Sequence, residues 1–229
     1  MCKPNFRHEY KHYINYADYL SLRQRLRQVA ARDRHAGPNG SYTVHSLYFD
    51  NLDNKALREK LDGVNHREKF RIRYYNSDTS FLRLEKKSKH NSLGCKQSAV
   101  ITPEECGRIL SRDIEWMQSD RRELVMELYR KIRCQLLRPK TPVVYDREAY
   151  LYPAGNVRIT VDSRIRMGLS CADFLFPDAP CILAKSPMIL EVKYDAFLPD
   201  LIGSIVQERS RQSSAFSKYA ACRAAGGYL

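Results

Sequence analysis

Several stretches of the chain alternate between apolar and charged residues, which is the period of a β-strand. Residues 70–74 read Phe-Arg-Ile-Arg-Tyr, and the alternation recurs over 82–89 and 190–194. Because successive side chains of a strand point to opposite faces of its sheet, each stretch places apolar groups on one face and mostly positive charges on the other. A solvated face normally mixes the two signs, since like charges on neighbouring strands repel each other. The pattern therefore predicts a sheet face that gathers cations, as a site for a polyanion would.

The remaining pattern predicts a mixed α and β chain with a single domain over residues 1–229. Apolar residues at helical spacing follow Asn15 and Asp18, either of which could cap a helix, and Thr102-Pro-Glu-Glu is a typical helix start. We predict helices over 16–32, 51–61, from 102 onward, 121–137, 199–207 and 217–225. We predict strands over 42–49, 67–75, 81–89, 94–101, 142–152, 156–162 and 188–195.

These strands are too polar on one face for a doubly wound parallel sheet, whose strands are near-continuous apolar runs. A hairpin joining 67–75 to 81–89 favours an antiparallel sheet, either open or closed into a barrel. The fold class is therefore α+β, with helices on the apolar face and charge on the other. So many cations need water, an anion and a few carboxylates as partners, because an unpaired buried charge is costly.

Composition indicates a folded protein with an anionic partner. Hydrophobic residues make up 43% and charged residues 28% of the 229 residues, and the formal net charge is +13. Such an excess favours nucleic acid, phosphate-rich molecules or a membrane surface as the partner. No stretch approaches the ~20 apolar residues of a spanning helix, and the seven cysteines include no CxxC pair. We therefore expect a cytoplasmic protein without a membrane span.

An ordered set of motifs runs along nearly the whole chain. The first half contains Arg7-x-Glu9-x-Lys11, Ser-Leu-Tyr-Phe-Asp over 46–50, Arg71-Ile-Arg73 and Leu84-Glu85-x-Lys87. The second half contains Arg158-x-Thr160-x-Asp162, Leu-Glu-Val-Lys-Tyr over 190–194 and Ser217-Lys218-Tyr219. In this order they resemble the VTC domain, the catalytic domain of vacuolar transporter chaperone polyphosphate polymerases. That domain belongs to the triphosphate tunnel metalloenzyme (CYTH-like) superfamily.

The resemblance implies an antiparallel eight-stranded β-barrel tunnel with flanking helices. In the polymerases, the γ-phosphate of ATP passes to a growing polyphosphate chain held along the tunnel, with Mn²⁺ or Mg²⁺ as the cofactor. By matching motifs, the groups expected at the reaction are Lys11, Arg71, Arg73, Lys87, Arg158 and Lys218. Further phosphate contacts are expected from Lys96, Arg147, Arg166, Lys193 and Ser217.

Carboxylates would form the metal site, since divalent ions of this kind prefer hard oxygen ligands. The resemblance assigns Glu191 to the metal, while Glu85, Glu9 and Asp162 offer further oxygens. Tunnel triphosphatases carry Glu-x-Glu-x-Lys on the first strand, where this chain has Arg7 in place of the first Glu. That change replaces a metal ligand with a phosphate clamp, and it favours holding a long polyanion over activating water.

Three functions remain open at this point. The leading one is a metal-dependent phosphotransferase that makes polyphosphate from ATP. The second is a triphosphatase that hydrolyses tripolyphosphate or nucleoside triphosphates, and the third is a non-catalytic module for polyphosphate or RNA. A specific nucleic-acid partner is disfavoured, because basic residues are not interleaved with exposed aromatics in an RNP-like run. Any export would need separate membrane proteins. Glu85 could also be only an ion-pair partner, and Ser217 only a helix cap.

Overall fold

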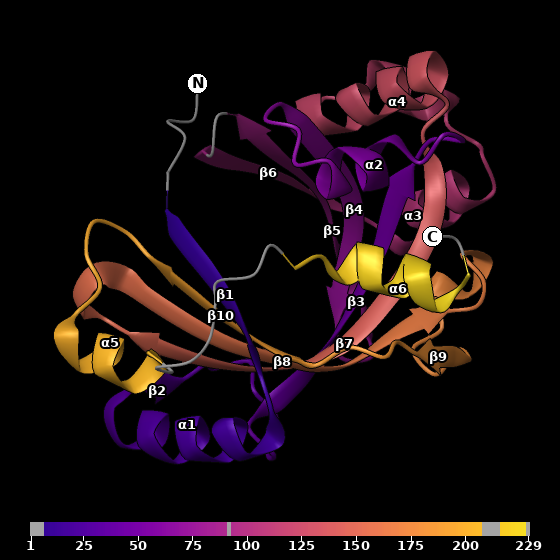
Figure 1. The fold of residues 1–229 in the computed structure, drawn as a ribbon. Helices are drawn as coiled ribbons and strands as arrows, with labels where there is room; N and C mark the ends of the chain where they lie inside the picture. The colour runs from indigo at the N-terminus through magenta and orange to yellow at the C-terminus, as the bar shows by residue number, and fades with distance from the viewer. Residues whose placement is uncertain (1–6, 91–92, 208–215, 228–229) are drawn as a thin grey trace.

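One large antiparallel sheet carries the fold (Figure 1). The computed structural model describes residues 7–90, 93–207 and 216–227. The main strands follow the order β1-β10-β8-β7-β3-β4-β5-β6, and two short strands, β2 and β9, pair with β7 and β8. The strands are β1 (His8–Ile14), β2 (Ala31–Arg32), β3 (Ser41–Asp50), β4 (Arg67–Tyr75), β5 (Asp78–His90), β6 (Leu93–Ile101), β7 (Arg138–Tyr152), β8 (Val157–Gly168), β9 (Cys181–Leu183) and β10 (Met188–Tyr194).

Helices cover both faces of this sheet in the described part of the chain. The α-helices are α1 (Tyr16–Val29), α2 (Lys55–Leu61), α3 (Pro103–Leu110), α4 (Glu123–Gln135), α5 (Asp200–Val206) and α6 (Lys218–Ala225). Short 3₁₀ helices are η1 (Glu115–Ser119), η2 (Ala154–Asn156) and η3 (Ala172–Leu175). Asn15 and Thr102 cap α1 and α3 through reciprocal hydrogen bonds, as their sequence predicts. Over the described ranges, every helix is too short or too polar to cross a membrane.

The apolar side of the strands faces outward onto helices, as the alternation predicts. One outer core packs α3, η1 and α4 on strands β3 to β6 and includes Ile72, Leu84 and Met117. A second outer core packs α1 and α5 on β1, β8 and β10 and includes Leu26 and Ile202. The charged side chains that alternate with these apolar residues therefore lie on the opposite, inner face, around which the sheet curves (Figure 1).

The predicted closed barrel is corrected to a curved sheet that stays open. Strands β1 and β6 are the two ends of the strand order, and no backbone pairing joins them among the residues that the structure describes. The reason is electrostatic, because closure would bring the cations of the inner face closer together without a ligand to separate them. The α+β class and the antiparallel sheet agree with the prediction.

The C-terminal helix α6 lies on the inner face and not with the outer helices (Figure 1). Tyr219 and Cys222 pack there against Val44 and Tyr145, forming a third core at one end of the inner face. The hydroxyl of Tyr219 donates a hydrogen bond of 2.8 Å to Asp50. The helix thus fills the space inside one end of the curved sheet.

Several strands extend beyond their predicted limits, β7 and β8 by the most at one end, and others differ from the prediction. Strand β8 continues to Gly168 through a β-bulge at Arg164, whose φ of 48° shifts the register against β7. Strand β7 starts at Arg138 and not at 142. The segment expected as a loop over 173–187 contains η3 and β9, and β2 lies within the segment predicted as a helix over 16–32. Strand β1 was expected only from the resemblance, which places Glu9 and Lys11 on a first strand.

Candidate functional site

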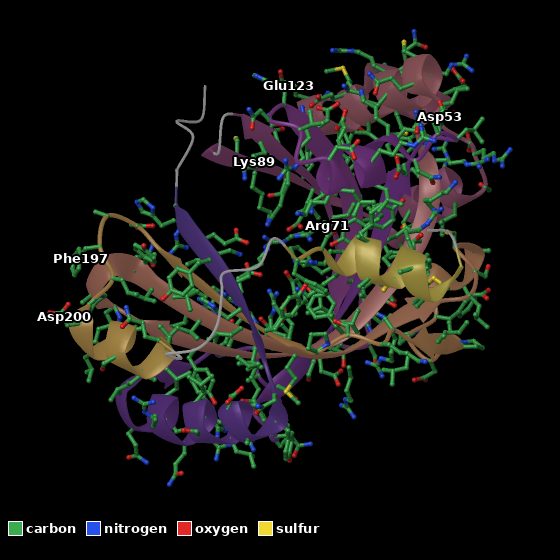
Figure 2. The ribbon with its side chains drawn as sticks, viewed as in Figure 1. Asp53, Arg71, Lys89, Glu123, Phe197 and Asp200 are labelled. Carbon is green, nitrogen blue, oxygen red and sulfur yellow. The ribbon has the colours of Figure 1, made fainter. Side chains whose placement is uncertain are left out.

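Charged residues from all but one of the main strands meet on the inner face. We call this set the inner cluster, and it contains nine cations and four carboxylates. Its members are Glu9, Lys11, Lys69, Arg71, Arg73, Glu85, Lys87, Lys96, Arg147, Asp162, Glu191, Lys193 and Lys218. Arg71 lies within the curve of the sheet, whereas Glu123 and Asp200 lie at the periphery (Figure 2). With nine cations against four carboxylates, the inner face is net positive.

Glu85 is a fully buried carboxylate that holds cations from neighbouring strands. Its Oε2 accepts a hydrogen bond of 2.7 Å from Nε of Arg71 and lies 3.9 Å from Nη1 of Arg73. Its other oxygen pairs with Lys96. Burial opposes ionisation, but Arg71, Arg73 and Lys96 outweigh it and hold the pKa of Glu85 well below its usual range. Glu85 thus fixes the side chains that would contact a ligand.

Asp162 is the corresponding buried carboxylate on β8. Arg147 donates two hydrogen bonds to it, of 2.6 and 2.7 Å, and Nζ of Lys218 lies 2.6 Å from its Oδ2. Lys218 also lies 4.8 Å from the centre of the Tyr145 ring. Despite burial, Arg147 and Lys218 lower the pKa of Asp162 to about 2. The C-terminal helix is therefore tied to the inner face by a buried ion pair.

Glu9 and Glu191 lie together on the neighbouring strands β1 and β10. Lys11 bridges them, with its Nζ 2.6 Å from Glu9 and 3.7 Å from Glu191. Lys193 pairs with the other oxygen of Glu191. Burial and the charge of Glu191 act to raise the pKa of Glu9, but Lys11, Lys193 and Lys87 outweigh them and the pKa is lowered. Both carboxylates are thus ionised at neutral pH.

Three lysines form a row across β4, β5 and β6. Lys69 is directly opposite Lys87, and Lys87 is directly opposite Lys96. Within the described residues, Lys69 and Lys87 have no carboxylate at ion-pair distance. Burial lowers the pKa of Lys69 to about 8, and burial with Lys193 and Arg71 lowers that of Lys87 well below its usual range. Like charges in this arrangement repel each other, so the row would gain stability from a bound anion.

The carboxylates offer a partial fit to the expected divalent metal. No set of three or more potential ligand side chains converges in the described ranges. Glu9 and Glu191 do converge on one cation, the ammonium of Lys11, and their oxygens are hard ligands. Glu85 is separate from them, because Arg71 and Lys96 occupy its oxygens. The residues thus fit one ion held by Glu9 and Glu191 together with oxygens of the substrate.

Three other residues expected at the site lie at its margin or outside it. Arg158 donates hydrogen bonds to Asp33 (2.6 Å) and Tyr42 (3.1 Å), near the edge of the cluster. Arg166 donates to Asp146 (3.0 Å), because the bulge at Arg164 changes which residues of β8 face inward. The hydroxyl of Ser217 accepts from the backbone N–H of Ala220 and caps α6.

Sequence reasoning missed two residues of the inner face, Lys69 and Tyr48. Lys69 lies two residues before Arg71, so the strand period that selected Arg71 and Arg73 also selects Lys69. Tyr48 packs in the third core, and it is also directly opposite Arg71 and accepts a hydrogen bond of 3.2 Å from its Nη1. Its aromatic type concealed its position among the cations.

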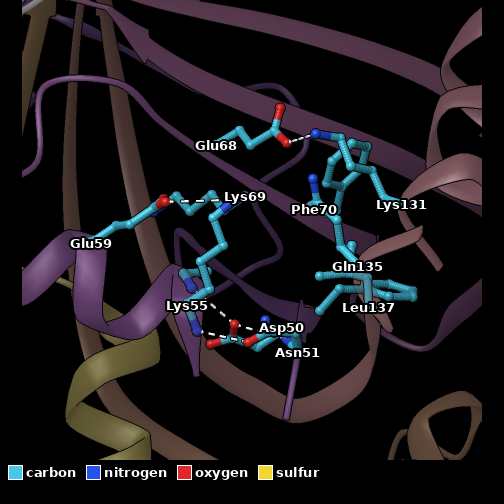
Figure 3. A pocket seen from close by; sticks show the side chains of 12 residues that line it. Asp50, Asn51, Lys55, Glu59, Glu68, Lys69, Phe70, Lys131, Gln135 and Leu137 are labelled. Carbon is cyan, nitrogen blue, oxygen red and sulfur yellow. Dashed lines mark hydrogen bonds and ion pairs between the residues drawn. The ribbon is translucent and has the colours of Figure 1, made fainter. Parts of the chain in front are cut away.

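Two cavities at the edge of the inner cluster contain ion pairs. A small cavity of about 20 Å³ lies beside α2 and α4, where Glu59 pairs with Lys55 and Glu68 with Lys131 (Figure 3). A larger one of about 520 Å³ lies beside α1 on the outer face. There, Glu148 pairs with Arg23 at 3.1 Å. Lys69 lines the first cavity and Arg147 lines the second, so each cavity borders the inner cluster.

Comparison with known proteins agrees with this geometry. Protein PH1012 from Pyrococcus horikoshii OT3 is similar in structure with a TM-score of 0.50 at 11% sequence identity, over 93% of this chain and 96% of that one. Protein Pfu-838710-001 from Pyrococcus furiosus gives the same TM-score and identity, over 92% of this chain and 96% of that one. These likenesses support the fold alone. No curated protein matches the chain. The VTC domain, however, matches residues 6–226, nearly the full length, and the chain therefore belongs to the VTC domain family.

Proposed function

We propose that the protein is a metal-dependent polyphosphate polymerase that uses ATP. The observation that carries the proposal is the row Lys69, Lys87 and Lys96, in which two lysines have no carboxylate partner in the described ranges. A chain of phosphates carries negative charge at short, regular intervals and would separate these ammonium groups. Membership of the VTC domain family supports the same ligand class.

The reaction needs positioning and charge neutralisation more than covalent help from the protein. A terminal oxygen of the polyphosphate acceptor attacks the γ-phosphorus of ATP, the bond to the β,γ-bridging oxygen breaks, and ADP leaves. Arg71 and Arg73, held in place by Glu85, would contact the equatorial oxygens. The row of lysines would neutralise the acceptor phosphates, which otherwise repel the incoming nucleotide.

Glu9 and Glu191 would hold Mn²⁺ or Mg²⁺ in the working enzyme. Such an ion neutralises phosphate charge and orients phosphate oxygens. Lys11, which bridges the two carboxylates in the ligand-free protein, would then turn toward a phosphate. Arg158, Lys193 and Lys218 would extend the contacts toward the ends of the inner face.

One assay distinguishes the proposed activity from its alternatives. The pure protein is incubated with ATP and Mn²⁺ or Mg²⁺, and the products are resolved by length while tripolyphosphate binding is measured by calorimetry. Long polyphosphate supports the polymerase, and free phosphate without chains would indicate a triphosphatase. Binding without turnover would indicate a non-catalytic module. The absence of both binding and turnover would refute the proposal.

The metal assignment has its own test in Glu191→Gln. This change keeps the shape of the side chain and removes one charge, so turnover should collapse while tripolyphosphate binding survives in part through the remaining cations. Glu59→Gln is the matched control, because Glu59 pairs with Lys55 outside the inner cluster. If Glu191→Gln turns over ATP as fast as the wild type at low metal concentration, Glu191 is not a metal ligand.

A further inference from the structure

Tyr48 is the group on the inner face whose chemistry the proposed reaction does not use. It is 4% exposed, and its ring stacks on Tyr219 of α6 with centroids 5.2 Å apart. Arg71 donates a hydrogen bond of 3.2 Å to its oxygen. The ammonium of Lys69 lies 5.9 Å from the ring centroid, as does the guanidinium carbon of Arg71. A phenol is thus enclosed between two cations.

The charged groups with the largest influence on Tyr48 are all positive. Strand β4 contributes Lys69, Arg71 and Arg73, and α6 contributes Lys218. Arg71 is shared with Glu85, and Lys218 is shared with Asp162. Lys69 differs from both, because no carboxylate in the described residues lies within ion-pair distance of it. Tyr48 is the group that most favours the charged form of Lys69, ahead of Glu9.

We propose that Tyr48 is the resident counter-charge of the phosphate site. Its oxygen, as phenolate, offsets the charges of Lys69 and Arg71 in the ligand-free protein, and it takes up a proton when phosphate binds beside them. This inference rests on the proposed function for the identity of the anion. Tyr48 is a positioning residue in this account, since it acts through Lys69 and Arg71.

The direction of the charge effects supports this role. Burial disfavours the phenolate, but Arg71, Lys69, Arg73 and Lys218 outweigh burial and lower the pKa of Tyr48 to about 7. A phosphate next to the same cations adds negative charge, which raises the pKa of the phenol and draws a proton from solvent. The neutral phenol can then donate a hydrogen bond to a phosphate oxygen. Ligand binding above neutral pH is thereby coupled to proton uptake at one defined oxygen.

Near-ultraviolet absorbance of the phenolate tests the inference directly. The ligand-free wild type should show a titration step near pH 7 that Tyr48→Phe lacks. Tyr10→Phe is the matched control, because burial raises the pKa of Tyr10 to about 12 and its removal should leave the step in place. Lys69→Met is a second variant, and it should move the step to higher pH by removing one stabilising cation.

Addition of tripolyphosphate at a pH above the step should abolish one equivalent of phenolate absorbance in the wild type. Tripolyphosphate should also bind the wild type more weakly as pH rises above the step. The ratio of its affinity for the wild type to its affinity for Tyr48→Phe should fall by up to roughly tenfold per pH unit. Lys69 and Lys87 also gain protons on binding, but ammonium groups do not absorb, so the absorbance change reports Tyr48.

Each result decides a separate part of the inference. A step near pH 7 that persists in Tyr48→Phe would overturn it, as would phenolate absorbance that is unchanged when calorimetry shows saturation with tripolyphosphate. Absence of tripolyphosphate binding would refute the proposed function instead. In that case the titration of the ligand-free protein still tests the counter-charge role. Loss of the titration step near pH 7 in Tyr48→Phe supports that role, and a step that is the same in Tyr48→Phe as in the wild type overturns it.

Discussion

The two faces of strands β4 and β5 treat charge in opposite ways. On the inner face, Lys69 and Lys87 are directly opposite each other without a carboxylate between them in the described structure. One residue along each strand, on the outer face, Glu68 lies 3.3 Å from Lys86, which also pairs with Glu127 of α4. The same hairpin thus pairs these charges on the helix side, whereas on the inner side Lys69 and Lys87 are left without a carboxylate at ion-pair distance in the described residues.

From this difference we infer that the outer face serves folding and that the inner face serves the proposed ligand. Matched charges at a helix–sheet contact add little stability each, but they allow lysine and glutamate to lie beside an apolar core. Opposed lysines reduce stability in the ligand-free protein. Proteins commonly retain such costs where function requires them. We therefore read the outer face as the structural one and the inner face as the binding one.

The largest expected effect tests the structural side of this comparison. Ile72 is fully buried in the outer core between Arg71 and Arg73. Ile72→Ala should lower the free energy of unfolding by about 2–5 kcal/mol, because it removes buried methylenes and leaves a cavity. Chemical denaturation measures the loss, and tripolyphosphate affinity of the folded variant should stay near that of the wild type. A selective loss of binding with normal stability would invert the assignment of the faces.

The second prediction tests the binding side with a pair of neighbouring lysines. Lys87→Met removes an inner-face cation and should weaken tripolyphosphate binding by about 1.5–3 kcal/mol, as when a charge-assisted hydrogen bond is lost. Thermal stability should not fall, since repulsion with Lys69 and Lys96 is relieved. Lys86→Met is the matched control on the outer face. It should cost about 1 kcal/mol or less of stability and leave affinity unchanged. Equal effects of the two changes on affinity would refute the contrast.

The sequence predicts the faces of the sheet well, because strand period alone assigns them. Arg71 and Arg73 face inward and Ile72 faces outward, as the alternation at 70–74 requires. The helix starts at Asn15 and Thr102 were equally readable, since capping is a local interaction between residues three apart. Local chemistry and a fixed period thus carry most of the fold.

Features that depend on distant parts of the chain were not readable. The bulge at Arg164 turns Arg166 away from the inner cluster, and nothing at that position in the sequence marks it as a bulge. Strand β1 carries mixed polar residues, and its partner β10 lies almost 180 residues later. Whether β1 meets β6 depends on the charge balance of the whole inner face. The sequence therefore predicted which charged residues share the inner face better than the shape of the sheet that holds them.

The smallest expected effect concerns stability at alkaline pH and separates the two lysines again. Burial lowers the pKa of Lys87 in the folded protein below the value near 10.5 that it has in the unfolded chain. Between these two values the unfolded chain binds more protons, so the folded state gains stability as pH rises, by at most about 1.4 kcal/mol per pH unit. The lowered pKa values of Tyr48 and Lys69 also make the folded state more stable as pH rises. Both residues are present in Lys87→Met, so the difference from the wild type reports Lys87.

Lys86 has the opposite linkage, which makes it the control. Its pKa is raised, because its pairs with Glu127 and Glu68 outweigh burial, so its contribution is present below about 10.5 and is lost only as pH rises further. Denaturation midpoints measured from neutral pH to about pH 10 should therefore rise less steeply in Lys87→Met than in the wild type. Lys86→Met should follow the wild-type slope over that range. Parallel curves of denaturation midpoint against pH for the wild type and Lys87→Met would mean that Lys87 is already well solvated. The repulsion within the row of lysines would then be too small to explain a preference for bound phosphate.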